Sequence, residues 1–243
     1  MSDSDSKTNL YGDLLTPLAG GCGVDIASQR ADDLDNLALG DIRTRGTAGT
    51  RVRALDVACG EGGQSVRMAL AGAQVTACDI QPMGERIAES AHAAGAMPVA
   101  FVQADMRDLR KTLNGIAPAE FDILLCQRAI HYLHFDDAIL ALRELRSLAA
   151  PDARLYLSAS GLDSELGQGY LARDRTLRGR FAPLDPVMAE KHHIHHSVTL
   201  YTEDGLATVA GLSGWNAVRI FRSAFGNIKG VFDVVRDGRR ESA

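Results

Sequence analysis

Three aspartates and one glycine-rich segment in the first half of the chain have the types and spacing needed for ligand chemistry. Asp56 lies in an apolar run, directly before the segment VACGEGG (57–63), and Asp79 and Asp105 each end a later apolar run. Small residues let the backbone approach a ligand, and the free N–H groups at a helix start attract anionic groups. A carboxylate at a strand end can accept both hydroxyls of a ribose. The pattern predicts a nucleoside-binding edge.

A nicotinamide dinucleotide is an alternative ligand, because Ala58, Gly60 and Gly63 fit a degenerate dinucleotide-binding fingerprint. A pyrophosphate would be repelled by an acid as close as Asp56, whereas a cationic amino-acid ligand would be attracted. The acids therefore favour a positively charged nucleoside over a dinucleotide.

Strands and helices alternate around these residues. Strands are expected at 52–58, 74–78, 99–103, 121–126 and 154–158, with helices at 63–71, 82–94 and 136–149. A helix at 203–211 is followed by two strands, 217–223 and 228–235, whose short connection makes them antiparallel. This alternation predicts an α/β fold with a doubly wound, mostly parallel sheet.

Two segments lie outside this rhythm. Residues 1–8 are expected to be a disordered tail, and 10–42 two or three short helices broken at Gly20, Gly21 and Gly23. Together they make an N-terminal tail and helical lid (1–50), ahead of a main domain (51–243). A polar insertion at about 161–202 is long enough to be functional and is expected on the acceptor side of the site.

Composition narrows the function classes. The 243-residue chain has a net charge of −5, which makes nucleic acid an unlikely partner. Four cysteines without a CxxC pair indicate reduced thiols in a cytoplasmic protein. No apolar run is long enough to cross a membrane. The oligomeric state is not determined by the sequence.

The acids and the loop together resemble the class I S-adenosylmethionine-dependent methyltransferases. Their acid-x-Gly-x-Gly-x-Gly motif corresponds to Asp56-x-Ala58-x-Gly60-x-Gly62, with Ala in place of the first Gly. The similarity covers about 52–158. It implies a seven-stranded, Rossmann-like sheet of order 3-2-1-4-5-7-6 with the last strand antiparallel, and S-adenosylmethionine as the cofactor.

The resemblance also implies roles for individual residues. Asp56 and the loop would hold the methionyl part of the cofactor, Asp79 the ribose, and Ile80 and Asp105 the adenine. The cofactor-binding residues expected on this basis are Asp56, Ala58, Gly60, Glu61, Gly62, Asp79, Ile80, Asp105, Met106 and Gln127.

The acceptor is expected beyond the fourth strand. His131 is a candidate base and Arg128 a candidate partner for an acidic substrate, although a packed histidine and a surface ion pair are equally simple interpretations. Acceptor-binding candidates are Tyr11, Tyr132, His192, His195 and His196. His192 and His196 would share one face of a helix, but too few further ligands lie nearby, so no metal site is predicted.

These features predict a methyltransferase that acts on a small molecule by in-line transfer. The segments that mark nucleic-acid methyltransferases, Asn/Asp-Pro-Pro-Tyr after the fourth strand and a Pro-Cys pair, are absent, and CQRA (126–129) stands at the first position. The alternatives are a non-catalytic S-adenosylmethionine-binding or partner-binding protein on the same fold, an RNA or protein methyltransferase, and a nicotinamide oxidoreductase.

Overall fold

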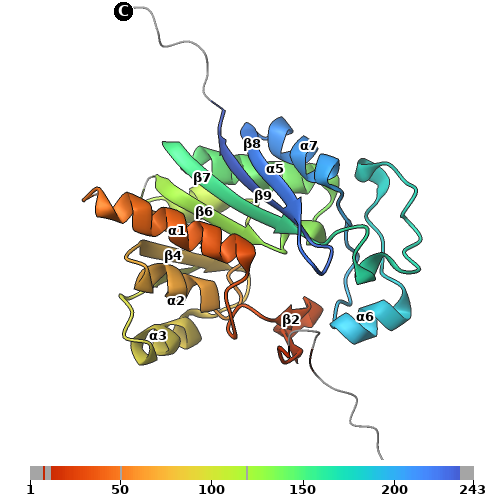
Figure 1. Ribbon diagram of the computed structural model, residues 1–243, viewed down its shortest axis with the longest axis horizontal. Helices are drawn as coiled ribbons and strands as arrows, with labels where there is room; N and C mark the ends of the chain where they lie inside the picture. The colour runs from red at the N-terminus through yellow and green to blue at the C-terminus, as the bar shows by residue number, and fades with distance from the viewer. Residues whose placement is uncertain (1–7, 9–11, 50, 119, 236–243) are drawn as a thin grey trace, which may run out of the picture.

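A single twisted sheet carries the candidate site (Figure 1). The computed structural model describes residues 8, 12–49, 51–118 and 120–235. The sheet has seven strands: β3 (Arg53–Val57), β4 (Gln74–Asp79), β5 (Ala100–Gln103), β6 (Phe121–Gln127), β7 (Ala149–Ala159), β8 (Trp215–Arg222) and β9 (Ile228–Val234).

The strand order is β5-β4-β3-β6-β7-β9-β8. Counted along the chain from β3, this is the order 3-2-1-4-5-7-6. The strands β5, β4, β3, β6 and β7 are parallel neighbours, whereas β9 is antiparallel to both β7 and β8. The predicted fold class is therefore confirmed. Because parallel strands end at one edge, the residues after β3, β4, β5 and β6 meet there.

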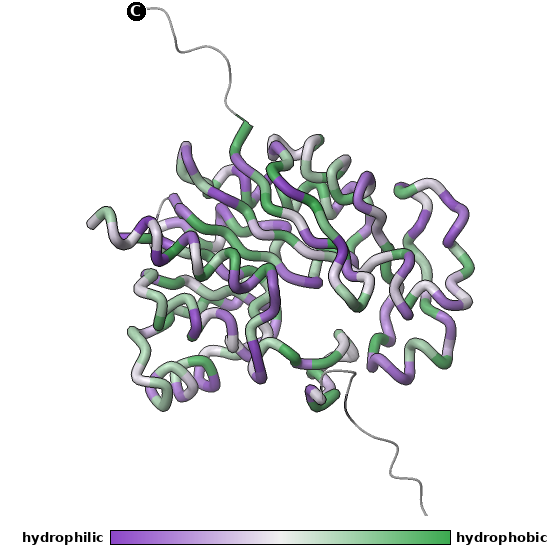
Figure 2. The backbone as a smooth tube through the Cα atoms, in the orientation of Figure 1, coloured by the Kyte–Doolittle hydropathy of each residue, from purple (hydrophilic) through white to green (hydrophobic). Residues whose placement is uncertain are grey.

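Helices cover both faces of this sheet. Their bounds are α1 (Asp33–Thr47), α2 (Gly63–Leu70), α3 (Gly84–Ala93), α4 (Leu109–Leu113), α5 (Phe135–Ser147), α6 (Pro186–His192) and α7 (Glu203–Leu212). The core on one face joins residues of α1 and α2 to the sheet, and the core on the other joins residues of α4, α5 and α7. In Figure 2 apolar segments gather along the central strands, while the insertion mixes polar and apolar residues.

Strand β6 shows how the sequence specifies this arrangement. Ile123 and Leu125 belong to the core with α1 and α2, whereas Leu124 and Cys126 belong to the core on the other face. Each of these side chains is at most 1% exposed. A strand buried on both faces needs a continuous apolar run, because successive side chains point to opposite faces.

The N-terminal segment differs from its prediction. The prediction of helices ahead of α1 is wrong. The described residues there form a small antiparallel hairpin, β1 (Thr16–Pro17) and β2 (Val24–Asp25), with a 3-10 turn at Ala19–Gly21. Helix α1 begins instead at the N-cap Asp32, whose carboxylate accepts from the backbone N–H of Leu34 and Asp35 at 2.8 and 3.0 Å. The glycines explain the difference, since Gly20 and Gly23 adopt φ of 77° and 95° and turn the chain back. The predicted tail, residues 1–8, lies outside the described residues except for Thr8.

The insertion also departs from its prediction at one point. His192 and His196 do not share a helical face, because α6 ends at His192 and His193 takes a left-handed conformation. The insertion has an apolar cluster of its own, built from Leu162, Leu166, Tyr170, Ala172, Leu184, Met188, Ile194, Val198 and Leu200.

Strand β7 is longer than expected. It starts at Ala149 rather than at Arg154, and its register with β6 shifts between Phe121 and Ile123. Pro151 lies near the start of this strand, where the pairing with β6 is irregular. A proline is tolerated there because no regular ladder hydrogen bond is lost.

Substitution of two glycines by alanine tests how tightly the start of the insertion packs against the rest of the fold. A Cβ at Gly161, where the insertion starts, would lie 1.8 Å from the carbonyl oxygen of Gly226, whereas one at Gly211 in α7 meets nothing within 4 Å. We expect Gly161→Ala to lower the free energy of unfolding by about 1–3 kcal/mol through overpacking. Gly211→Ala should raise it by about 0.5–1 kcal/mol, because alanine favours the helix. Urea denaturation measures both, and effects of the same sign would contradict this account.

Candidate functional site

The glycine-rich turn after β3 is tied to the neighbouring strand by Asp79. Its carboxylate accepts hydrogen bonds from the backbone N–H of Gly60 and of Gln81, both at 2.9 Å. Ala58, where the resemblance expects glycine, has a left-handed φ of 55°, and Gly60 has 53°. The turn therefore takes the conformation that glycine favours, even at the position where the side chain is a methyl group.

Asp56 lies beneath this turn and is only 3% exposed. The hydroxyl of Ser65, in the first turn of α2, donates to Asp56 Oδ2 at 2.5 Å. Burial raises the pKa of Asp56 to about 7, and the charges of Asp35 and Asp79 add to the rise against the hydrogen bond from Ser65. Three carboxylates thus influence one another at this edge, as expected of a site for a cation.

Close packing at the start of α2 brings the N-terminal segment onto the turn. A Cβ at Gly63 would lie 2.3 Å from the carbonyl oxygen of Ala27, and one at Gly62 would lie 2.5 Å from the side chain of Ile87. Leu18 of the hairpin is the neighbour of Gly60, 3.9 Å from where its Cβ would be. Both glycines are required because two other segments occupy the space of a side chain.

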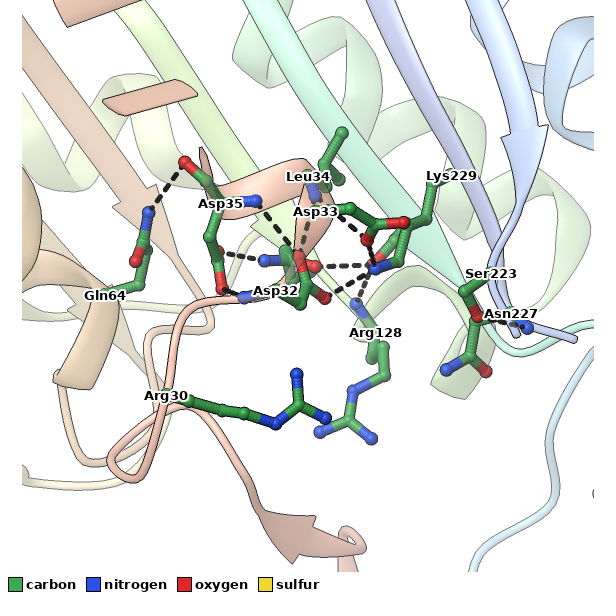
Figure 3. Close-up of polar contacts among 12 residues, drawn as sticks. Arg30, Asp32, Asp33, Leu34, Asp35, Gln64, Arg128, Ser223, Asn227 and Lys229 are labelled. Carbon is green, nitrogen blue, oxygen red and sulfur yellow. Dashed lines mark hydrogen bonds and ion pairs between the residues drawn. The ribbon is translucent and has the colours of Figure 1, made fainter. Parts of the chain in front are cut away.

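Asp35, labelled in the close-up of Figure 3, meets Gln127 at this edge. The amide nitrogen of Gln127 donates to Asp35 Oδ1, and its amide oxygen accepts from the hydroxyl of Ser158 at 3.2 Å. Asp35 is 2% exposed, and burial, followed by the charge of Asp32, raises its pKa to about 6. Gln127, predicted to bind cofactor, therefore reaches the edge together with an acid from α1.

Lys229 holds the start of α1 against the sheet. Its ammonium group contacts Asp32 Oδ2 at 2.7 Å and also Asp33 Oδ1, and Lys229 is 4% exposed (Figure 3). The charge of Lys229 contributes to keeping the pKa of Asp32 below its usual value, although burial alone would raise it. This buried ion pair connects β9 to the helix that carries Asp35.

The predicted adenine-side residues lie along the same edge. Asp79 ends β4, and Ile80 is 61% exposed, so its side chain is available to a planar ligand. Asp105 pairs with Arg107 at 2.6 Å and accepts from its backbone N–H at 2.9 Å. The hydrogen bond from Arg107 is the main reason that the pKa of Asp105 is low. Met106 is partly buried against the core.

Glu61, a residue of the turn, forms an ion pair with helix α3, which contains none of the predicted site residues. Its carboxylate contacts Arg86 of α3 at 2.5 Å. Burial raises its pKa against the opposing charge of Arg86, and a hydrogen bond with Asp25 also raises it. Glu61 therefore links the turn, α3 and the hairpin through its side chain.

His131 is unsuited to the role of a base. It is 2% exposed, and its Nδ1 has no hydrogen-bond partner among the described residues. Burial, with a smaller contribution from the charge of Arg128, lowers the pKa of His131 to about 3. The simpler interpretation, a packed histidine, fits this geometry better than proton abstraction near neutral pH.

Tyr132 and two histidines of the insertion, His195 and His196, lie against the N-terminal hairpin. The rings of Tyr132 and His196 make an edge contact with centroids 6.3 Å apart. The backbone N–H of His195 donates to Gly21 O at 3.1 Å, and His196 Nε2 lies 2.6 Å from Gly20 O. His192 instead contacts Glu165 at 3.1 Å. His195 and His196 thus join the insertion to the hairpin, and His192 stabilises the insertion itself.

Two further expectations concern the rest of the chain. Tyr11 lies outside the described residues. Within the described ranges, no group of three or more His, Cys, Asp or Glu side chains could hold a metal ion.

A hollow of about 550 Å³ lies at the opposite edge of the sheet. The charged residues that line it pair with one another, as Arg154 does with Asp233 at 2.9 Å.

Sequence reasoning missed the contributions of the N-terminal hairpin, of the start of α1 and of β9. Asp35 and Lys229 were not among the predicted site residues, and the hairpin was expected to be helical. The run Asp32-Asp33-x-Asp35 ahead of apolar residues is a helix-start signal that could have located α1. The sequence contains no comparable signal for Lys229, whose partners lie almost the whole chain away.

Comparison with known proteins agrees with this geometry. Residues 54–152 match the family described as a methyltransferase domain. The match contains the glycine turn, Asp56, Asp79, Asp105 and β6. The matched segment is similar to a methyltransferase domain over less than half of the chain. It begins at β3 and ends within β7, so the hairpin, the insertion and β8–β9 lie outside the matched part.

Curated relatives share only part of this protein. A ubiquinone biosynthesis O-methyltransferase of Xanthomonas euvesicatoria is 33% identical over 132 residues, which cover 52% of each chain. The corresponding enzyme of Haemophilus ducreyi is 29% identical over 125 residues, 51% of this chain and 52% of its own. The chain therefore spans about half the length of the curated relatives it matches.

Solved structures share the fold over most of the chain. A 1,6-didemethyltoxoflavin-N1-methyltransferase of Burkholderia thailandensis superposes with a TM-score of 0.58 and 19% identity, covering 84% of this chain and 79% of that one. A protein of Pyrococcus horikoshii superposes with a TM-score of 0.59 and 16% identity over 85% and 93%. In the described part of this chain, no helix is long and apolar enough to cross a membrane.

The raised pKa of Asp56 predicts a pH dependence of stability. A carboxyl whose pKa rises from about 3.9 in the unfolded chain to about 7 in the folded protein favours the fold while protonated, so stability falls as the pH rises through this window. We expect the free energy of unfolding to fall between pH 5 and pH 8 by on the order of 2 kcal/mol more in the wild type than in Asp56→Asn. Urea titrations at both pH values measure this, and parallel pH profiles would contradict it.

Proposed function

We propose that this protein transfers the methyl group of S-adenosylmethionine to a small-molecule acceptor. The observation that carries the proposal is the convergence of Asp56, Asp79 and the glycine turn at one edge of the sheet, where two backbone N–H groups already point at Asp79. This arrangement suits a ligand that combines a ribose, an amino-acid tail and a positive charge. A pyrophosphate at the same place would face Asp56, Asp35 and Asp79.

The residues of the edge fit the cofactor in distinct ways. Asp79 would accept the ribose hydroxyls, Ile80 would pack on the adenine, and the turn with Asp56 and Gln127 would hold the amino-acid tail. When bound, S-adenosylmethionine supplies an electrophilic methyl group next to a positive sulfur. The carboxylates favour that charge, and they favour the neutral demethylated product less, which assists product release.

The cover over this edge supports a small acceptor. The N-terminal hairpin contacts the turn through Leu18 and the insertion through hydrogen bonds from Gly23 N to His193 O and from His195 N to Gly21 O, at 2.9 and 3.1 Å. A covered site excludes water and orients the acceptor, which is the main contribution a protein makes to an in-line displacement. Covering the edge on two sides also hinders access by a folded macromolecule.

Activation of the acceptor is expected without a histidine base. His131, with its pKa near 3, remains neutral and has no proton-accepting role at neutral pH. The acceptor would therefore lose its proton to solvent before or after transfer, according to its own acidity. Alignment against the methyl group then accounts for most of the acceleration, since effective molarities of aligned reactants correspond to about 7–11 kcal/mol.

Loss of the Asp79 carboxylate tests cofactor binding. We expect Asp79→Ala to weaken binding of S-adenosylhomocysteine by about 1–3 kcal/mol, because a charge-assisted bond to ribose is lost. Glu89→Ala, which removes an exposed carboxylate from α3, is the matched control and should leave the affinity unchanged. Isothermal titration calorimetry measures both.

The same titrations separate the alternatives. Unchanged affinity in Asp79→Ala would contradict the ribose assignment. Heat with NAD or NADP and none with S-adenosylhomocysteine would indicate an oxidoreductase instead. Binding without methyl transfer to any small acceptor would support the non-catalytic or macromolecular alternatives, and mass spectrometry of acceptors incubated with S-adenosylmethionine detects the transfer.

A further inference from the structure

Arg128 has an unusual backbone conformation directly after β6. Its φ is 47°, a left-handed value that residues other than glycine adopt rarely. The backbone N–H of Arg128 lies 2.9 Å from Ser158 O and 3.1 Å from Ser158 Oγ, so a single N–H is shared between two acceptors on β7. This local strain is maintained by the neighbouring strand, and it determines the direction in which the side chain leaves the sheet.

The guanidinium group of Arg128 has few partners. Its one hydrogen bond in the described part of the chain runs from Nη2 to the carbonyl oxygen of Val24, at 3.3 Å, and no carboxylate there lies within ion-pair distance. Arg128 is only partly exposed. A guanidinium carries five N–H donors in a planar fork that matches a carboxylate, and a half-buried charge is normally paired.

The other cations at this edge are satisfied by the protein itself. Lys229 contacts both Asp32 and Asp33. Arg30 forms a two-pronged pair with Asp13, in which Nε donates to Oδ1 and Nη2 to Oδ2, both at 2.8 Å. Arg67 donates to Gln64 and to two backbone carbonyls. Arg128 differs from Lys229 and Arg30 because the described residues supply it with no anionic partner, and from Arg67 because its side chain makes a single hydrogen bond with them.

The surroundings of Arg128 place it on the acceptor side. Burial lowers the pKa values of His131 and His192 and raises that of Tyr132. The charge of Arg128 adds to the first two shifts and opposes the third, so the guanidinium lies near all three side chains. Val24, its hydrogen-bond partner, belongs to the hairpin that covers the edge. In Figure 3 the side chains of Arg128 and Arg30 extend toward the same region, below the Asp32–Lys229 contact.

We propose that the methyl acceptor carries an anionic group, such as a carboxylate, and that Arg128 binds it. The proposal rests on the proposed function and specifies its substrate class. Arg128 would act as a substrate-positioning residue: the fork orients the acceptor while Ser158 holds the arginine backbone in place. The hairpin carbonyl of Val24 would occupy one donor and leave the others to the anion.

Two ligands of similar size, one charged and one neutral, test whether Arg128 binds an anionic group. Benzoate and benzamide differ chiefly in charge, and each is titrated into the full-length protein saturated with S-adenosylhomocysteine, with ligand-observed NMR as the readout. We expect the wild type to bind benzoate at least about tenfold more tightly than benzamide, as a charge-assisted pair would give. Arg128→Gln should abolish this preference, and Arg128→Lys should retain part of it, because lysine keeps the charge without the fork.

A second arginine provides the control. Arg143, on the exposed side of α5, also donates to a single backbone carbonyl, Leu212 O at 3.2 Å, so Arg143→Gln makes the same charge change away from the site. It should keep the preference for benzoate. Equal binding of the two probes by the wild type, or a preference that survives Arg128→Gln, would overturn the proposal.

Cofactor affinity separates this proposal from the proposed function. Arg128→Gln should change the Kd for S-adenosylhomocysteine by less than about twofold, since the arginine is assigned to the acceptor. A loss of S-adenosylhomocysteine affinity, with unchanged binding of 5′-methylthioadenosine, would show that Arg128 binds the amino-acid tail of the cofactor and would overturn the proposal. Failure of the wild type to bind S-adenosylhomocysteine would instead count against the proposed function.

Discussion

The candidate site depends on the hydrogen bonds that the carboxylate of Asp79 accepts. It belongs to β4, yet it accepts the backbone N–H of Gly60 in the turn that follows β3. The parallel register, which places Asp56 opposite Ala77 and Val57 opposite Cys78, brings the ends of the two strands to one level. Once this bond forms, the turn, the helix that follows it and the buried Asp56 have defined positions. The site is thus preorganised by the sheet rather than by the loop alone.

This edge concentrates negative charge at a cost in stability. Asp35 and Asp56 are almost completely buried, and their pKa values, about 6 and about 7, show that burial opposes ionisation. These two acids accept hydrogen bonds but form no ion pair with the described residues, and a buried acid in that situation costs stability unless a cation compensates its charge. The positive sulfonium and amino groups of S-adenosylmethionine would provide that compensation, so the strain of the free protein and the affinity for the cofactor have one physical origin.

The parts of the chain outside the common methyltransferase domain act together. The hairpin and the insertion are joined by backbone hydrogen bonds and by the contact of His196 with Gly20. The hairpin in turn packs on the turn through Leu18 and is followed by the close approach of Ala27 to Gly63. Because these contacts connect the cofactor edge with the insertion, displacement of one part would disturb the other. Acceptor choice is expected to depend on these segments, which lie outside the part of the chain that matches a methyltransferase domain, 54–152.

The sequence by itself determined the α/β fold and the edge at which Asp56, Asp79 and the glycine turn meet, whereas the strand order was implied by the resemblance to the class I methyltransferases. The fold class and the position of this edge follow from local patterns. The spacing of apolar residues, the glycine turn and the acids at strand ends each involve only a few neighbouring residues. The tertiary structure alone decided that 16–25 form a hairpin, that His192 and His196 do not share a helical face, and that His131 is buried. It also brought Asp35 to Gln127 and Lys229 to Asp32, across 92 and 197 residues. Contacts at such separations depend on how distant segments pack, and the spacing of residues along the chain does not predict them.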